Sequence, residues 1–259
     1  MSNTPRRRSM VAATALAVLA LGVVACQSDR PDDRRPATGT TAPARTDNLG
    51  AAPAPTTAAP DPTLDAALVA AAADNDEQRV RELITRGANI EARGEQDRTP
   101  LVAATKARAT AAARALIEAG ADVNAKDALQ DSAYLYAGAE GIDDILELTL
   151  THGADIHSVN RYGGTALIPA SEHGHITTVR RLIEAGVDVD HINTPRWTAL
   201  HEAIVYGDGS QRYQQVVTAL LDAGADPAIR DGSGRTALDN AERLGQTAVA
   251  AILRDRAQR

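Results

Sequence analysis

Two marks recur together along residues 63–259 and divide this part of the 259-residue chain into similar units. One is a glycine in phrases such as Ala-Gly-Ala-Asp-Val, and the other is a Thr or Ser that precedes an apolar run. Both recur at gaps of 33, 33, 33 and 38 residues. The glycines are Gly87, Gly120, Gly153, Gly186 and Gly224, and the hydroxyl residues are Thr99, Ser132, Thr165, Thr198 and Thr236. Two marks in one register indicate internal repeats.

Each unit has the hydrophobic spacing of two short helices. The Thr or Ser hydroxyl can cap the first helix by accepting from its free backbone N–H groups, and Pro100 occupies a first helical position, where no donor is needed. Leu two residues after the cap and Ala five residues after it form one apolar face. Pairs such as Leu116-Ile117 place a second helix on the same core. Glycines that can end the first helices in the left-handed conformation are Gly141, Gly174, Gly207 and Gly245.

This pattern of Thr-Pro-Leu, Gly-His, Leu-Ile and Gly-Ala-Asp phrases resembles the ankyrin repeat over residues 63–259. The resemblance implies an all-α fold, an α-solenoid of about six helix-turn-helix units with projecting β-turn fingers, in which fingers and first helices line a concave groove. Neighbouring units then cover each other's apolar faces. The expected units are residues 63–93, 94–126, 127–158, 159–191, 192–230 and 231–259.

Several positions depart from the repeat pattern. The second unit has Arg108 where glycine is expected, and the third has Tyr134 where leucine is expected. Pro169 lies early in a first helix and should cost one backbone hydrogen bond or shift the helix start. The fifth unit carries five extra residues between Tyr206 and Val216, where its two helices join. This insertion is either a tolerated surface loop or a second contact site.

The first 25 residues have the pattern of a signal peptide. Three arginines at positions 6–8 precede an apolar run over residues 10–25, which is shorter than a bilayer-spanning helix requires. The run ends in Val-Val-Ala-Cys, which resembles a bacterial lipobox, so Cys26, the only cysteine, is the predicted lipidation site. We therefore expect an exported bacterial ankyrin-repeat lipoprotein, anchored by lipid to the cell membrane on its extracytoplasmic side, in the periplasm or at the cell surface. The alternative is an incidental cysteine.

Residues 26–62 differ in composition from the repeats. Residues 27–62 contain seven of the twelve prolines, together with many Thr and Ala, and Leu49 is their only large apolar residue. Such a segment cannot bury a core. We expect a disordered linker that tethers the repeats to the membrane.

Charge and residue spacing exclude several function classes. A formal net charge of -7 gives no basic footprint for nucleic acid. Of the six histidines, three occupy ordinary ankyrin positions, and none has paired ligand spacing with a cysteine. No serine or cysteine nucleophile and no phosphate-binding loop is recognisable. The sequence predicts that the protein is not an enzyme and has no cofactor, metal site or catalytic residue.

All six aromatic residues fall in the third to fifth units. In the family register, Tyr162 and Trp197 stand on fingers, while Tyr136 and Tyr206 stand on first helices and face the groove. Charged and polar residues beside them are Glu140, Arg161, Glu172, His173, Arg196 and Glu202. Because Tyr and Trp often anchor interfaces, these ten residues form the predicted partner-binding groove. In the alternative interpretation, Tyr162 and Trp197 only pack on neighbouring fingers.

The predicted function is that of a monomeric, membrane-anchored extracytoplasmic scaffold or adaptor that binds a protein partner in this groove. One alternative is an immunity or inhibitor protein that neutralises a toxin or enzyme at the cell envelope. A further alternative is an accessory factor of an envelope enzyme.

Overall fold

The computed structural model describes residues 61–258 of the chain. The predicted signal peptide, Cys26 and nearly all of the predicted linker lie outside the described residues. The described part contains twelve α-helices, one short 3-10 turn and no strand, so the expected all-α solenoid of helix pairs is confirmed. Within this part, every helix is too short or too polar to cross a bilayer.

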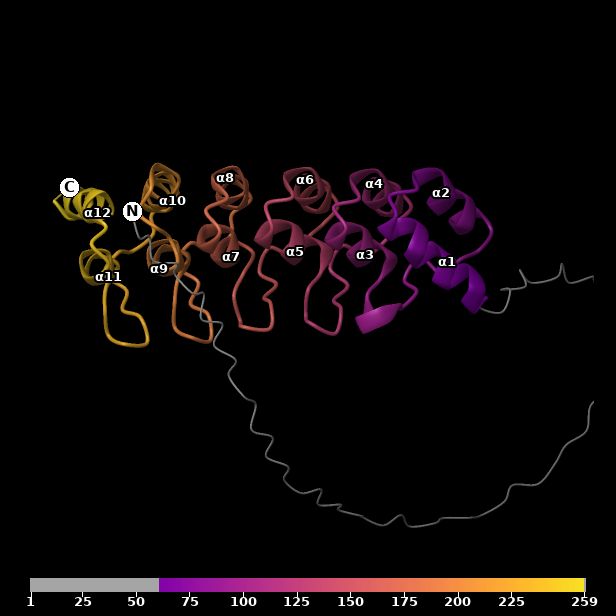
Figure 1. Ribbon diagram of the computed structural model, residues 1–259, viewed down its shortest axis with the longest axis horizontal. Helices are drawn as coiled ribbons and strands as arrows, with labels where there is room; N and C mark the ends of the chain where they lie inside the picture. Colours follow the sequence, from indigo (N-terminus) through magenta and orange to yellow (C-terminus); the bar gives the residue numbers. More distant parts are fainter. Residues whose placement is uncertain (1–60, 259) are drawn as a thin grey trace, which may run out of the picture. The chain divides into compact units, whose positions relative to one another are not determined.

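The helices form two parallel rows (Figure 1). The first helices of the six units are α1 Pro62–Ala73, α3 Pro100–Lys106, α5 Ala133–Ala139, α7 Leu167–Glu172, α9 Ala199–Val205 and α11 Ala237–Arg243. The second helices are α2 Glu77–Thr85, α4 Thr110–Glu118, α6 Asp143–Thr151, α8 Ile176–Glu184, α10 Gln211–Asp222 and α12 Thr247–Ala257. The loops between units project beyond the row of first helices as fingers, and the finger before α3 contains the 3-10 turn Glu95–Asp97.

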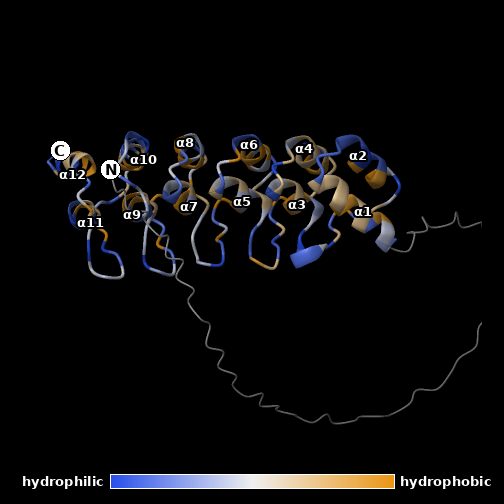
Figure 2. Ribbon diagram, viewed as in Figure 1, coloured by the Kyte–Doolittle hydropathy of each residue, from blue (hydrophilic) through white to orange (hydrophobic). Residues whose placement is uncertain are grey.

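One continuous core lies between the two rows, where the apolar faces of the helices meet (Figure 2). The alanines five residues after each cap are fully buried and allow neighbouring first helices to pack closely. They are Ala104, Ala137, Ala170, Ala203 and Ala241. Tyr134 is fully buried in the place of leucine, and its hydroxyl has no hydrogen-bond partner among the described residues. Because each unit needs its neighbours to bury its apolar face, the stack is stable only as an array.

The predicted helix caps form in four of the five units that carry the mark. The backbone N–H of Val102 donates to the Thr99 hydroxyl at 3.1 Å, and the hydroxyls of Ser132, Thr198 and Thr236 accept equivalent bonds. Thr165 makes no such bond, so its predicted cap is wrong. The cause is Pro169, which has no N–H to donate to the Thr165 carbonyl. Ile168 N–H donates to that carbonyl instead, at 3.2 Å, and α7 begins one residue later than its counterparts.

The junctions between paired helices use the left-handed conformation. Gly141, Gly174 and Gly245 have φ values of 65°, 69° and 68°, and Arg108 adopts the same conformation at 57°. The prediction for Gly207 is wrong, because the insertion moves the left-handed residue to Gly209, at 70°.

The five-residue insertion lies partly in a helix and partly in a junction loop. Helix α10 has twelve residues, whereas α4, α6 and α8 each have nine. Tyr213, in the first turn of α10, donates its hydroxyl to the Glu172 carbonyl at 2.9 Å. The insertion therefore lies against the carboxyl end of α7, next to a residue of the predicted groove.

Each finger from the third unit onward is closed by an Asn or Asp side chain. Asp127 accepts from the N–H groups of Leu129 and Asp131, at 2.8 and 3.0 Å. The residues in this position are Asp127, Asn160, Asn193 and Asp231. Their gaps of 33, 33 and 38 repeat the register of the glycines. These finger-closing residues could therefore have been found from the sequence, although the cap and glycine positions alone did not identify them.

Candidate partner-binding site

The finger side of units three to five contains a cavity of about 510 Å³, here called the groove cavity. It is bordered by α5, α7 and α9 and by residues of the three fingers that precede these helices. Eight of the ten predicted groove residues line it: Tyr136, Glu140, Arg161, Tyr162, Glu172, His173, Glu202 and Tyr206. The structure therefore brings together residues that are up to 70 positions apart in the sequence.

The repeat register explains the position of the cavity. Tyr136, Pro169 and Glu202 occupy the same place in three successive first helices, and all three line the cavity. In this row, Pro169 with its compact ring stands between Tyr136 and Glu202, which have longer side chains. Glu140, His173 and Tyr206 form a second row at the carboxyl ends of the same helices.

The remaining two predicted residues, Arg196 and Trp197, do not line the groove cavity. Arg196 lies at the tip of its finger in the left-handed conformation, with φ of 67°. The Trp197 ring lies against Tyr206 of its own unit, with ring centroids 5.4 Å apart and planes tilted by 56°. Trp197 therefore contacts a residue at the edge of the cavity. Tyr162, on the preceding finger, is 55 % exposed, and the Arg161 guanidinium lies 4.8 Å from its ring centroid.

The acids at the α5 end of the cavity are paired with cations from unit two. Lys106 Nζ lies 2.7 Å from Asp131 and 3.0 Å from Asp127, and it also lies 4.6 Å from the ring centroid of Tyr136. Arg108 lies 3.5 Å from Glu140. These contacts neutralise this end of the cavity and occupy one face of Tyr136.

The acids at the α9 end are arranged differently. Glu202 is only 7 % exposed, and its Oε1 accepts a 2.7 Å hydrogen bond from the Asn193 side-chain amide. Burial, together with repulsion from the neighbouring Glu172, raises the pKa of Glu202 to about 7. Among residues 61–258, no cation forms an ion pair with Glu172 or Glu202. The groove cavity therefore has a neutralised end and an acidic end.

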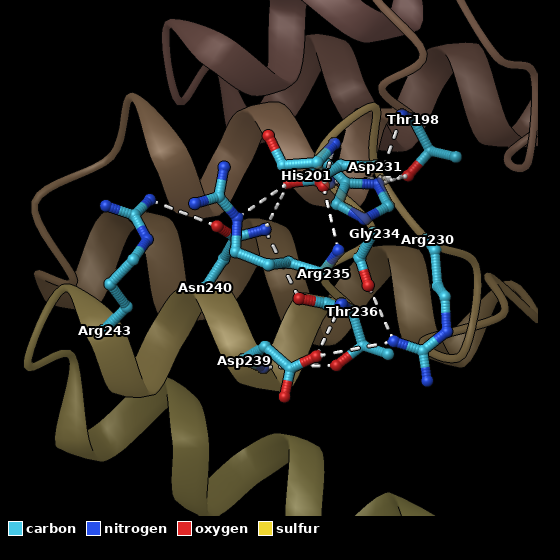
Figure 3. Close-up of polar contacts among 11 residues, drawn as sticks. Thr198, His201, Arg230, Asp231, Gly234, Arg235, Thr236, Asp239, Asn240 and Arg243 are labelled. Carbon is cyan, nitrogen blue, oxygen red and sulfur yellow. Dashed lines mark hydrogen bonds and ion pairs between the residues drawn. The ribbon is translucent and has the colours of Figure 1, made fainter.

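A second polar cluster lies between units five and six and is buried (Figure 3). Asp231 accepts from Asn240 at 3.0 Å and from the backbone N–H groups of Ser233 and Arg235. His201 Nδ1 lies 2.9 Å from the Thr198 hydroxyl, and burial lowers the pKa of His201. Asp231, Asn240 and His201 are all buried, so this cluster closes the finger of unit six and offers no open surface.

Two other features of the described residues bear on the choice of site. A hollow of about 590 Å³ on the opposite row, bordered by α8, α10 and α12, is lined by both polar and apolar side chains and contains no aromatic residue. Within residues 61–258, no three His, Cys, Asp or Glu side chains gather closely enough to hold a metal ion. The groove cavity is therefore the site with the chemistry of an interface.

Stacked helix pairs that present fingers, exposed aromatic rings and an open polar cavity define a repeat protein of the protein-interaction class. The chain belongs to the ankyrin-repeat family: the family model for ankyrin repeats (3 copies) matches residues 56–127 and 134–231. No curated protein matches the chain.

Solved ankyrin structures superpose on most of the chain. An ankyrin repeat domain from Acinetobacter baumannii AYE is 52 % identical, with a TM-score of 0.71, over 73 % of this chain and 97 % of that one. The ankyrin repeat protein EF0377 is 42 % identical, with a TM-score of 0.70, over 73 % and 96 %. A chain from the complex of a Bdellovibrio bacteriovorus predatory endopeptidase with its immunity protein is 23 % identical, with a TM-score of 0.64, over 73 % and 97 %. This last likeness concerns the fold alone.

Proposed function

We propose that the protein is a membrane-anchored, extracytoplasmic scaffold that holds a protein partner in the groove cavity. The observation that carries the proposal is the convergence of eight predicted groove residues on one cavity. Two of its tyrosines, Tyr162 and Tyr206, are more than half exposed. Exposed aromatic rings beside a polar cavity are typical of the central contacts in protein interfaces. The ankyrin family supports the same function.

Affinity capture tests the partner site. The full-length chain, in membranes of its own host, is compared with a Trp197→Ala/Tyr206→Ala variant, and co-purifying proteins are quantified. We expect at least a tenfold loss of the partner without a lower melting temperature, because Tyr206 lines the cavity and is more than half exposed, and the Trp197 ring packs against it. The matched control is Leu244→Ala, since Leu244 is an exposed apolar residue at the position equivalent to Tyr206 in unit six. A variant that loses both the partner and its stability would indicate a structural role for the two rings.

The proposed anchor depends on Cys26, which follows the apolar run of the predicted signal peptide. Diacylglyceryl transfer to its thiol would supply more than one acyl chain, which stable anchoring requires. Cys26→Ser should move the protein from the membrane fraction to the soluble extracytoplasmic fraction and abolish labelling by a fatty-acid probe. Unchanged fractionation of the variant, with no label on the parent, contradicts the anchor.

An immunity or inhibitor protein is the second candidate function. The observation in its favour is the shared fold with a chain from an endopeptidase–immunity protein complex. The two functions differ in what binding does to the partner. An inhibitor should abolish the activity of one tightly bound enzyme at equimolar concentration, whereas a scaffold should leave the activity of its partner intact. An activity assay on the captured partner, with and without the repeat protein, separates them.

A further inference from the structure

We infer that the acidic end of the groove cavity seats the guanidinium group of an arginine on the protein partner, between Glu172 and Glu202 and against the ring of Tyr206. The inference rests on the proposed function, because it names the chemistry by which that cavity holds a partner. It specifies a basic partner segment, which the net charge of -7 of the chain also favours.

The acids at the two ends of the cavity differ in their ion pairing. Asp131 and Glu140 each have a cation from unit two within 3.5 Å. Glu172 and Glu202 have no ion-pair partner among the described residues, although Glu202 is more than nine-tenths buried. Asn193 donates to Oε1 of Glu202, and a hydrogen bond between the carboxyls of Glu202 and Glu172 contributes to the raised pKa of Glu202. Two buried carboxylates repel each other once this proton is lost, and a cation that takes the place of the proton offsets both the burial and the repulsion.

At the neutralised end, the chain itself combines a cation, an aromatic ring and an acid: Lys106 lies over the ring of Tyr136 and against Asp131. The acidic end offers the same kinds of group, the ring of Tyr206 and the carboxyls of Glu202 and Glu172, and all three residues line the cavity. Tyr206 stands at the register position of Glu140, so the likeness concerns the types of group and not their positions. Burial, followed by the charges of Glu202 and Glu172, raises the pKa of Tyr206.

Within residues 61–258, no side chain forms an ion pair with the two acids at this end. The position of Lys106 in the repeat register is taken by Ala139 in unit three, by Glu172 in unit four and by Val205 in unit five. Tyr206 is 58 % exposed, and its ring contacts that of Trp197. An incoming cation can therefore stack on a ring that is already held in place.

The choice of guanidinium follows from the number and type of acceptors. Two carboxyl groups and an aromatic face surround the position, and a planar guanidinium can donate to both acids while it stacks on the ring. A lysine ammonium presents a point charge and cannot make the same planar contacts. The Tyr213 hydroxyl donates to the backbone carbonyl of Glu172, so the insertion contacts the main chain that carries one of the two acids.

The test uses the full-length chain and two small probes of nearly identical shape. Acetyl-arginine amide carries the guanidinium, and acetyl-citrulline amide carries a neutral urea in its place. Trp197 is the only tryptophan of the chain and touches Tyr206, so its fluorescence reports on occupation of the acidic end. At pH 8 we expect a saturable change with acetyl-arginine amide, with a dissociation constant on the order of a few millimolar for so small a ligand. Acetyl-citrulline amide should give none.

Two variants locate the binding. Glu202→Gln and Glu172→Gln keep the side-chain size and should each weaken acetyl-arginine amide binding by about tenfold or more, as expected for loss of a charge-assisted contact. Glu82→Gln is the matched control, because Glu82 is an exposed acid on α2 paired with Arg79 and lies far from the cavity. Equal responses to both probes, no saturation with acetyl-arginine amide, or unchanged binding by Glu202→Gln would overturn the inference.

The capture assay separates this inference from the proposed function. If Trp197→Ala/Tyr206→Ala loses the partner but Glu172→Gln/Glu202→Gln retains it, the scaffold function stands and the guanidinium site is wrong. If both double variants retain the partner, the groove cavity is not its binding site and both proposals fail. Loss of the partner in both variants, with unchanged melting temperatures, supports both.

Discussion

Units five and six place an asparagine and an acid at the same two positions, but in opposite order. In unit five the finger carries Asn193 and the helix carries Glu202, and the two side chains are joined by a 2.7 Å hydrogen bond. In unit six the finger carries Asp231 and the helix carries Asn240, with a 3.0 Å bond. Both pairs are nine residues apart in the sequence. The reversal gives the two acids opposite electrostatic environments.

Backbone donors account for the difference. Burial opposes the charge of Asp231, yet the bonds from Asn240 and from the N–H groups of Arg235 and Ser233 hold the pKa of Asp231 well below its usual range. Glu202 lies on the helix, beyond the reach of these finger N–H groups, and it faces Glu172. In unit five Pro195 also replaces one of the finger donors, so Asn193 accepts only from Trp197 N–H. The same pair of residue types thus closes a finger in unit six and leaves an acid open to the cavity in unit five.

The largest expected change in the free energy of unfolding follows from the removal of Asp231, the acid of unit six. Asp231→Ala leaves the Ser233 and Arg235 N–H groups and the Asn240 amide without their acceptor, and should lower the free energy of unfolding by about 3 kcal/mol. Asn193→Ala should cost about half as much, because its finger has one backbone donor to that side chain. Urea denaturation at pH 7 measures both. Equal losses would mean that backbone donors do not distinguish the two units.

Removal of Glu202, the acid of unit five, should raise the free energy of unfolding. Folding raises the pKa of Glu202 from 4.5 to about 7, so the folded state binds its proton more tightly than the unfolded state does. The free energy of unfolding therefore falls as pH rises between about 4.5 and 7, and the full cost is present above pH 7. Glu202→Gln keeps the acceptor for Asn193 and removes this cost. We expect a gain of about 2 kcal/mol at pH 8 and a clearly smaller gain at pH 5.

Denaturation at several pH values checks this prediction. His201 has the reverse dependence, because burial lowers its pKa and protonation below about pH 6.5 destabilises the folded state. His201 is present in both proteins, so its effect cancels in the difference between wild type and Glu202→Gln. A gain that is equal at pH 5 and pH 8 would show that Glu202 is not the titrating group.

The unit-six arrangement can also be transferred to unit five. Asn193→Asp combined with Glu202→Gln moves the acid onto the finger, where Pro195 provides no N–H. The double variant should therefore be about 1 kcal/mol less stable than Glu202→Gln alone at pH 8, since a buried carboxylate lacks one of its donors. It should also fail to bind acetyl-arginine amide as tightly as wild type. A double variant more stable than Glu202→Gln would contradict the role given to Pro195.

The repeat register explains how much of this could be predicted from the sequence. Glycine and Thr or Ser marks at fixed gaps predicted the helix pairs, and the same register placed eight groove residues on one cavity. The predictions of a cap at Thr165 and of a left-handed Gly207 were wrong. The missing N–H of Pro169 changes the first and the insertion changes the second, and both act locally within otherwise regular units. The state of Glu202 could not be predicted, since it depends on the distance to Glu172 from another helix and on a donor from a finger.

The smallest expected effect concerns the insertion, which unit six lacks. Tyr213→Phe removes the hydroxyl that donates to the Glu172 carbonyl and keeps the ring, which is buried against the unit-five junction. We expect a loss of about 0.5 to 1 kcal/mol in the free energy of unfolding, the usual value for one net hydrogen bond. If the insertion also positions Glu172, the variant should weaken acetyl-arginine amide binding by a factor of about two to three, whereas Leu244→Ala in unit six should change neither quantity to that extent. A loss of stability without any change in acetyl-arginine amide binding would mean that the insertion only contributes to packing. The geometry of the acidic end would then be set by α7 and α9, and α10 would not contribute to it.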